Sequence, residues 1–291
     1  MKVAFIGAGK VGKAMGMYLS DNSIKVVGYY SKSFSSAEMA ASVTKSRAYN
    51  SILQLLEDAD TIAITTPDDE IANVIDGLKK NNAVVKGKVV FHMSGVHSSD
   101  ILSVLKDNKE NKTTILSLHP LLSFSDSTNS VRDLKRTFFT MEGEGERLEE
   151  VKDLLKELGN NFIEISAESK VLYHTGCTVL ANYFVTIIDV GLAMLIESGF
   201  TKEQASMIAE PLIKNTLENI IRQDTEKALT GPISRGDFGT IEQHISYLKK
   251  SGKWLELYKI LGTHTIELAK RAGTVNQESV LKLMEVIDDN E

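Results

Sequence analysis

Apolar positions in the first half of the chain follow two alternating spacings. Short runs rich in Val and Ile have the length and composition of buried strands, and they occupy residues 2–6, 25–30, 61–65, 88–93 and 114–118. Between these runs, as at 51–58 and 70–78, apolar residues recur every three or four positions, which is typical of amphipathic helices. Strands that alternate with helices predict crossover connections and a mainly parallel sheet covered on both faces.

The second half of the chain has a helical pattern. One further strand–helix–strand unit precedes it, at 138–141, 146–158 and 162–165. From residue 167 onward the apolar spacing predicts helices at 170–197, 202–222, 223–229, 240–250, 255–272 and 277–287. Thr240 and Gln243 have the spacing of a capping box, and Gly199 and Gly273 stand where helices end. The sequence therefore predicts an α/β domain at 1–166 followed by an all-α domain at 167–291.

Composition narrows the functional classes. With 33 Lys and Arg against 39 Asp and Glu, the 291-residue chain carries a formal net charge of −6, which disfavours bulk nucleic-acid binding. The hydrophobic fraction of 42% is that of a globular protein, the single Cys177 excludes an intrachain disulfide, and no metal-ligand spacing stands out. The longest apolar segment, 175–188, is shorter than the roughly 20 residues that span a bilayer. We therefore expect a cytoplasmic protein with no membrane partner.

The first strand ends in a glycine-rich turn that predicts a dinucleotide-binding site. The G-x-G-x-x-G pattern lies directly between a strand and a helix and comprises Gly7, Ala8, Gly9, Lys10, Val11 and Gly12. In this context the first glycine permits a tight turn, the second lets the backbone approach a pyrophosphate, and the third lets helix and strand pack closely. The first N–H groups of the helix are then available to phosphate oxygens. The pattern indicates a Rossmann-type, doubly wound domain.

The end of the second strand bears on the choice of dinucleotide. A site for NAD carries Asp or Glu here to accept the ribose 2′-hydroxyl, whereas this chain has Ser31, Lys32 and Ser33. Two hydroxyls and an ammonium suit the additional 2′-phosphate of NADP, so we predict NADP(H). The alternative for Lys32 is a solvated loop cation.

Polar residues also follow the next predicted strands, where strand ends form the ligand crevice of such a sheet. We expect Thr66 and Pro67 to border the cofactor, and Ser94 to contact the nicotinamide or the substrate. His119, followed by Pro120, closes a further strand. It is a candidate for proton transfer, with a structural strand-end histidine as the alternative.

The first helix of the second domain carries Lys170, His174 and Asn182. At 100° per residue, Lys170 and His174 lie about 40° apart around the helix and His174 and Asn182 about 80° apart, so all three are predicted to face one cleft. A reductase needs a proton donor beside the hydride acceptor and polar groups that fix the reacting oxygen. Lys170 also fits a simple helix-start cation, although cations are favoured at the opposite helix end.

Several motifs together resemble a known family. They are GAGKVG, TTPDD, HMSG, LHPLLSF, YHTGCTVLANY and LTGPISRGD, and they are similar to Rossmann-fold NADP-dependent oxidoreductases whose helical C-terminal domain carries a TGP-x-x-RGD signature. That family is related to pyrroline-5-carboxylate reductase, 6-phosphogluconate dehydrogenase and ketopantoate reductase. The resemblance implies that Lys170 matches a lysine of related dehydrogenases, with His174 where they have asparagine. His119-Pro120 is similar to a motif of prephenate dehydrogenases. The resemblance also implies that Thr230, Ser234 and Arg235 stand where pyrroline-5-carboxylate reductases bind a carboxylate.

We therefore expect an NADPH-dependent reductase that transfers hydride to the carbonyl of a small 2-oxo acid, with ketopantoate as the first candidate and the site in an interdomain cleft. Lys170 or His174 would protonate the alkoxide, Asn182 would hold the oxygen, and Arg235 would anchor the carboxylate unless it is an ion-paired loop anchor. The alternatives are reduction of a cyclic imine such as pyrroline-5-carboxylate, and a non-catalytic NADP(H)-binding sensor. The apolar surface of 171–196 predicts a homodimer.

Overall fold

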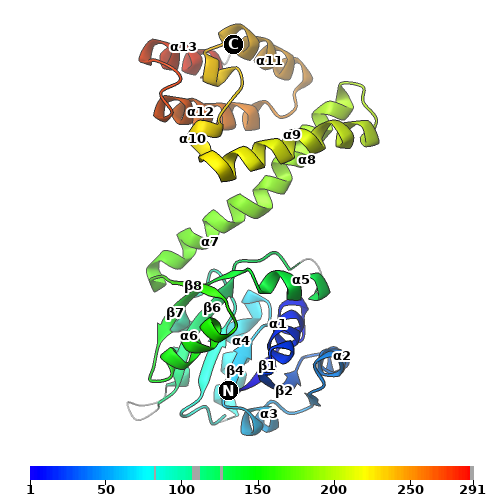
Figure 1. Cartoon of the computed structure of the whole chain (residues 1–291), viewed down its shortest axis with the longest axis vertical. Coiled ribbons are helices and arrows are strands. Elements are labelled where there is room, and N and C mark those ends of the chain that lie inside the picture. Colours follow the sequence, from blue (N-terminus) through cyan, green and yellow to red (C-terminus); the bar gives the residue numbers. More distant parts are fainter. Residues whose placement is uncertain (82, 107–111, 125–126, 289–291) are drawn as a thin grey trace. The chain divides into compact units, whose positions relative to one another are not determined.

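The computed structural model describes residues 1–81, 83–106, 112–124 and 127–288, and it divides into two compact units (Figure 1). Unit 1 is Met1–Tyr183 and unit 2 is Phe184–Glu291. The boundary predicted at residue 166 falls just after the last strand, whereas the units divide within the following helix. The difference arises because the first turns of that helix belong with the sheet, where Lys170 is buried.

A single sheet organises unit 1. Within the described residues it has eight strands: β1 (Lys2–Ile6), β2 (Lys25–Tyr30), β3 (Arg47–Tyr49), β4 (Thr61–Ile64), β5 (Val89–His92), β6 (Thr114–Pro120), β7 (Phe138–Glu144) and β8 (Asn161–Glu164). Their order is β3-β2-β1-β4-β5-β6-β7-β8. Strands β1 to β6 are parallel, β7 runs antiparallel to β6, and β8 is parallel to β7. The order reverses direction between β1 and β4, which confirms the predicted doubly wound, mainly parallel α/β fold.

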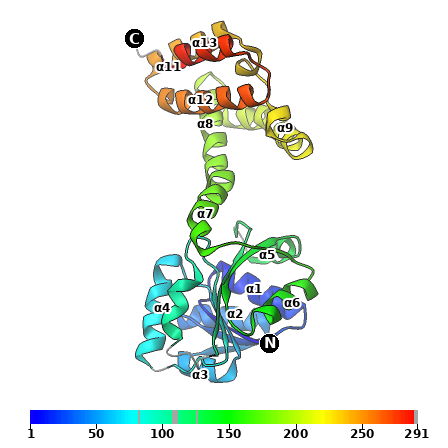
Figure 2. The ribbon, with the colours of Figure 1, turned by 90° about the vertical axis from the view of Figure 1, so that its left-hand side faces the viewer.

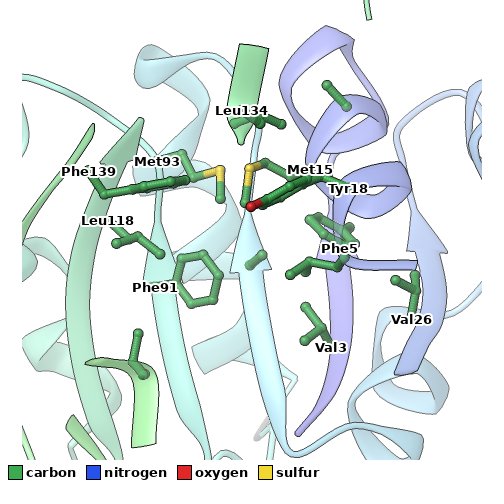
Figure 3. Packing of buried hydrophobic residues seen from close by; sticks show 14 of the residues in the cluster. Val3, Phe5, Met15, Tyr18, Val26, Phe91, Met93, Leu118, Leu134 and Phe139 are labelled. Atoms are coloured by element: carbon green, nitrogen blue, oxygen red, sulfur yellow. The ribbon is translucent and has the colours of Figure 1, made fainter. Parts of the chain in front are cut away.

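Helices cover both faces of this sheet (Figure 2). One face packs against α1 (Lys10–Asp21), α2 (Phe34–Thr44), α5 (Ser127–Leu134) and α6 (Leu148–Glu157). The other packs against α3 (Ile52–Asp58), α4 (Asp68–Lys80) and the 3₁₀ helix η1 (Ser99–Leu105). Figure 3 shows the first of these layers, in which Met15 and Tyr18 of α1 and Leu134 of α5 pack over Phe5, Phe91 and Phe139 of the strands. Burial on both faces explains the nearly continuous apolar runs of the central strands.

The sequence pattern gives no bounds for several elements of unit 1, among them β3, α2, η1 and α5. Strand β3 has only three residues and lies at the sheet edge, so it offers too short a pattern to detect. Helix α2 buries Ala37, Ala40 and Ala41 against α1 and the sheet, and such small side chains give a weak apolar period. The predicted strands at 114–118 and 138–141 extend further, as β6 and β7, because the two pair over six residues of each strand.

The long helix predicted at 170–197 changes its winding midway. It follows the short 3₁₀ turn η2 (Ala167–Ser169) and consists of α7 (Lys170–Thr178), a π-helical turn η3 (Val179–Tyr183) and α8 (Phe184–Glu197). By length and composition alone, Ala167–Glu197 could cross a membrane, which corrects the expectation drawn from 175–188. One such helix is weak evidence for a span, and the first turns of this one are bonded to side chains of the sheet.

Unit 2 continues with α9 (Lys202–Gln223), α10 (Thr225–Ala228), the 3₁₀ turn η4 (Ile233–Arg235), α11 (Phe238–Ser251), α12 (Leu255–Arg271) and α13 (Gln277–Asp288). Its core lies between η4, α11, α12 and α13 and includes Ile241, Ile266 and Leu283. The predicted capping box at Thr240 is wrong, because Asp237 caps α11 by accepting a bond from the Thr240 N–H. The same T-x-x-Q spacing forms a capping box at Thr201 and Gln204, at the start of α9.

Candidate functional site

The glycine-rich turn has the geometry that its three glycines predict. Gly7 adopts a φ of +110°, and a Cβ there would stand 2.7 Å from the backbone of Thr65. A Cβ on Gly12 would lie 2.5 Å from Thr65 Oγ1 and 2.6 Å from Gly7 O, so only glycine lets α1 pack this closely on the sheet. A Cβ on Gly9, by contrast, would meet nothing within 4 Å. The turn is therefore closed toward the sheet and open at Gly9, where the unpaired N–H groups of α1 begin.

A cavity of about 500 Å³ opens beside this turn, at the carboxyl ends of β1, β2 and β4. Seven predicted cofactor residues line it: Gly7, Ala8, Gly9, Ser31, Lys32, Thr66 and Pro67. Five others do not: Lys10, Val11, Gly12, Ser33 and Ser94. The sequence also missed lining residues on α4, among them Glu70 and Asn73, because a helix facing a strand end has no motif of its own. This volume fits part of a dinucleotide.

Thr66 marks the cavity as a site for a polar ligand. Of the described residues, it holds the one buried side-chain oxygen without a hydrogen-bond partner, Oγ1. Leaving a buried hydroxyl unsatisfied costs about 1–3 kcal/mol, so such an atom calls for an explanation. Its position in the lining of the cavity provides one, since a bound molecule could supply the missing bond.

Lys32 pairs with a carboxylate in the lining of the cavity. Its Nζ lies 3.4 Å from both carboxylate oxygens of Glu70, with 90% of the Lys32 side chain and 39% of the Glu70 side chain exposed. Asn73 Nδ2 also contacts Glu70, at 3.4 Å from Oε2. The sequence showed no carboxylate at the end of β2, and the structure brings one there from the first turn of α4. The site predicted for the 2′-phosphate therefore holds a cation, Lys32, that is paired with the carboxylate of Glu70.

A second cluster of side chains lies at the ends of β5 and β6. His119 Nδ1 lies 2.7 Å from the hydroxyl of Tyr173, which also accepts a bond from Thr140 Oγ1 at 3.0 Å. The imidazole of His174 packs edge-on against that of His119, with 5.9 Å between ring centroids. Both rings border Gly95, where a Cβ would stand 2.3 Å from His174 Cδ2 and 3.0 Å from His119 Nε2. The absence of a side chain at Gly95 thus makes room for the two imidazoles.

Lys170 is buried beneath this cluster rather than exposed beside it. Only 1% of the residue is accessible, and its Nζ donates to Ser117 Oγ at 2.6 Å and to Ser94 O at 3.3 Å. Ser117 Oγ donates in turn to Ser94 O, while Ser94 Oγ accepts bonds from the N–H groups of Val96 and His97. Lys170 therefore ties the ends of β5 and β6 together, and the side chain of Ser94 shapes its own loop.

Burial and positive charge keep the imidazoles of His119 and His92 neutral. Burial, reinforced by Lys170, His174 and His92, lowers the pKa of His119 to about 4. Burial similarly lowers the pKa of His92 to about 4, although the hydrogen bond to Ser98 O acts against the shift. Burial also lowers the pKa of Lys170, with Glu142 and Asp68 opposing the effect. At neutral pH His119 and His92 thus present uncharged rings next to a buried lysine.

The remaining predicted residues belong to other segments of the chain. Asn182 falls in the π-helical turn, so the uniform 100° step used to align it with His174 does not apply there. In unit 2, Arg235 is exposed at the end of η4, and Ser234 Oγ lies 3.4 Å from Thr274 Oγ1. Thr230 is also exposed. Across the described part of the chain, no group of three or more His, Cys, Asp or Glu side chains is arranged to hold a metal ion.

Known proteins share this fold. Residues 1–120 match the family model of a Rossmann-like domain, and residues 137–265 match that of a domain of unknown function (DUF2520). No curated protein matches the sequence. A solved structure from Thermotoga maritima, protein TM1727, is 24% identical, with 92% of this chain and 98% of that chain covered and a TM-score of 0.71.

Two further solved structures extend the comparison. A protein from Bacteroides fragilis is 18% identical over 91% of this chain and 98% of that chain, with a TM-score of 0.70. Pyrroline carboxylate reductase from Plasmodium falciparum, solved with NADP bound, is 15% identical over 97% of this chain and 98% of that chain, with a TM-score of 0.58. At these identities the likeness establishes the fold of the chain.

Proposed function

We propose that this protein is an NADPH-dependent reductase that acts on the carbonyl group of a small 2-oxo acid. One observation carries the proposal: a dinucleotide-type cavity and the paired imidazoles of His119 and His174 lie at the same carboxyl edge of one sheet, within unit 1. Ligands of doubly wound sheets bind at this edge, next to the point where the strand order reverses.

The residues of the cavity fit NADP(H). The open backbone at Gly9 and the start of α1 suit a pyrophosphate, and the unsatisfied hydroxyl of Thr66 suits a polar group of the ligand. Lys32 and Ser31 suit the 2′-phosphate. The NADP bound to the similar Plasmodium falciparum reductase supports this choice. When bound, NADPH supplies the hydride that reduces the carbonyl carbon.

The imidazole cluster supplies the groups that act on the carbonyl oxygen. His119 is neutral, so it polarises the oxygen as a hydrogen-bond donor, and the adjacent His174 delivers the proton to the developing alkoxide. Lys170, one of the two candidates that the sequence offers for the proton donor, takes a different role in this proposal. It holds the strand ends of β5 and β6 in place and adds positive potential beneath the site. The carboxylate-binding role of Thr230, Ser234 and Arg235 remains our proposal for unit 2.

A substrate panel tests the proposal directly. NADPH oxidation is followed with ketopantoate, other small 2-oxo acids and cyclic imines such as pyrroline-5-carboxylate. We expect turnover on an oxo acid, and a loss of about 10²-fold or more in kcat for His119→Gln and His174→Ala. His264→Gln is the matched control, since His264 is exposed on α12 in unit 2. Activity of both variants within about 2-fold of wild type would remove the two histidines from the mechanism.

A second candidate is the reduction of a cyclic imine, favoured by the likeness to pyrroline carboxylate reductase. Turnover on the imines alone would select this candidate. Tight NADPH binding with no turnover on any member of the panel would instead favour a sensor that binds the dinucleotide without catalysis.

A further inference from the structure

Three segments that are distant in sequence meet at the imidazole of His119. In the antiparallel pair of β6 and β7, His119 stands directly opposite Thr140, so their side chains share a face of the sheet. Tyr173, at the end of the first turn of α7, places its hydroxyl between them, 2.7 Å from His119 Nδ1 and 3.0 Å from Thr140 Oγ1. The contact between Tyr173, His119 and Thr140 therefore depends on the register of β6 and β7 and on the packing of α7 against the sheet.

Counting protons along this chain of bonds fixes their direction. Thr140 donates to the Tyr173 oxygen, which leaves the single phenolic proton for another acceptor. His119 Nδ1 is a strong acceptor in line for that proton. The thiol of Cys177 also contacts Tyr173, but thiol sulfur is a weak acceptor by comparison. His119 Nδ1 thus accepts, and the one proton of the neutral ring stands on Nε2.

The opposite ring nitrogen lies beside Gly95. Nε2 of His119 lies 3.0 Å from the place that a Cβ would take at Gly95, and the described residues offer it no hydrogen-bond partner. Burial also raises the pKa of Tyr173 to about 12, so the phenol keeps its proton at neutral pH. A neutral Nε2–H therefore stands beside Gly95.

We propose that Tyr173 is a positioning residue that fixes the tautomer of His119, so that Nε2–H is presented as the hydrogen-bond donor to the carbonyl oxygen of the substrate. The part that concerns the substrate rests on the proposed function. The tautomer itself does not, and it can be measured on the free protein.

Nitrogen NMR of protein labelled at histidine tests the tautomer, with the His119 signals assigned by their loss in His119→Gln. We expect the wild-type ring to be protonated at Nε2 and unprotonated at Nδ1 near neutral pH. Tyr173→Phe removes one oxygen atom, and the ring should then become a mixture of tautomers, because an ordinary hydrogen bond accounts for about a fivefold preference. Tyr183→Phe is the control, since Tyr183 is an exposed tyrosine of the same long helix, outside the cluster.

A pH titration of the same signals gives a second readout. The phenolic donor favours the neutral ring, so Tyr173→Phe should raise the pKa of His119 from about 4, while Lys170, His174 and His92 still face the ring. A His119 ring protonated at Nδ1 in the wild-type protein would overturn the inference. The nitrogen NMR spectrum of the wild-type protein shows this without any Tyr173 variant. An unchanged tautomer and titration in a folded Tyr173→Phe protein would overturn it as well.

Kinetics separate this inference from the proposed function. If both hold, Tyr173→Phe lowers kcat about 2- to 10-fold and leaves NADPH affinity unchanged, because the cavity residues are untouched. An Nε2 tautomer set by Tyr173 in a protein without turnover on any oxo acid or imine would refute the proposed function alone. The reverse result, with turnover present and the tautomer indifferent to Tyr173, would refute only the inference.

Discussion

The pairing of Lys32 with Glu70 makes a quantitative prediction about the choice between NADP and NAD. The 2′-phosphate carries a charge of about −1.5 to −2, and two unit charges about 4 Å apart in water interact by about 1 kcal/mol. The water value applies because 90% of the Lys32 side chain is exposed. Lys32 should therefore favour NADP by about 1.5–2 kcal/mol, which corresponds to roughly 10- to 30-fold in affinity.

Glu70 should act in the opposite sense. Its carboxylate lies 3.4 Å from Lys32 Nζ in the same cavity lining, so it repels a 2′-phosphate and can accept a bond from the free 2′-hydroxyl of NAD. We expect Glu70→Gln to tighten NADP binding by roughly 3- to 10-fold and to weaken NAD binding by a few-fold. Removing the Lys32–Glu70 pair itself should cost little stability, since exposed ion pairs contribute about 0–1 kcal/mol.

Calorimetric titration of NADP⁺ and NAD⁺ into wild type, Lys32→Ala, Glu70→Gln and the double variant measures these effects. Lys80→Ala serves as the control, because Lys80 is an exposed cation of the same helix α4 outside the cavity lining. The preference of wild type for NADP should also fall as salt is added. Equal changes in NADP and NAD affinity for Lys32→Ala would refute the assignment of the 2′-phosphate site.

Four further outcomes follow from the described contacts. The pKa of His92 lies near 4 in the folded protein against an ordinary value of 6.5, so the unfolded chain takes up a proton first as the pH falls. The free energy of unfolding measured by urea should therefore decline between about pH 6.5 and pH 4, by about 3 kcal/mol for His92, and His92→Gln should flatten that decline. Gly12→Ala forces a Cβ onto Thr65, so it should lower the free energy of unfolding by about 1–3 kcal/mol and weaken dinucleotide binding. Gly176→Ala is the control, because its Cβ would meet nothing within 4 Å, and it should be neutral or slightly stabilising in the same urea measurement. Arg235→Ala should raise KM for an oxo acid without changing NADPH affinity, and an unchanged KM would make Arg235 a loop anchor. Exposed apolar side chains on α8 and α9 lead us to propose a homodimer, and sedimentation at micromolar concentration that finds only monomer would contradict it.

The sequence was sufficient for the parts of the fold that repeat a local pattern. The glycine-rich turn, the apolar strands and the order of strand and helix all rest on neighbouring residues, and the structure confirms them. Helix starts were less secure, because a T-x-x-Q spacing occurs at both Thr201 and Thr240 and only the first makes a capping box. The T-x-x-Q spacing by itself does not distinguish these two segments. Asp237, three residues before Thr240, prevents a capping box there. Its carboxylate accepts the bond from the Thr240 N–H that the Gln243 side chain would accept in a capping box.

The candidate site likewise contains residues that a local pattern predicts and residues that it does not. Ser31, Lys32, Thr66 and Pro67 were found because each follows a predicted strand, and strand ends of a parallel sheet meet at one edge. Glu70 was missed because it reaches the same cavity from a helix, and its part in the site depends on where α4 lies against the sheet. A uniform step of 100° per residue does not place Asn182 relative to His174, because the π-helical turn alters the winding of the helix between them.

The contact between His119 and Tyr173 shows why part of such a site lies beyond sequence patterns. It requires β7 to turn back against β6 and to pair in a register that sets Thr140 opposite His119. A shift of one residue in that pairing would turn Thr140 to the other face of the sheet and leave the Tyr173 hydroxyl without its donor. The phenolic proton would then be free to serve another acceptor, and His119 could take either tautomer. The chemistry of the imidazole is therefore fixed by strand register, which depends on the whole sheet and on no single motif.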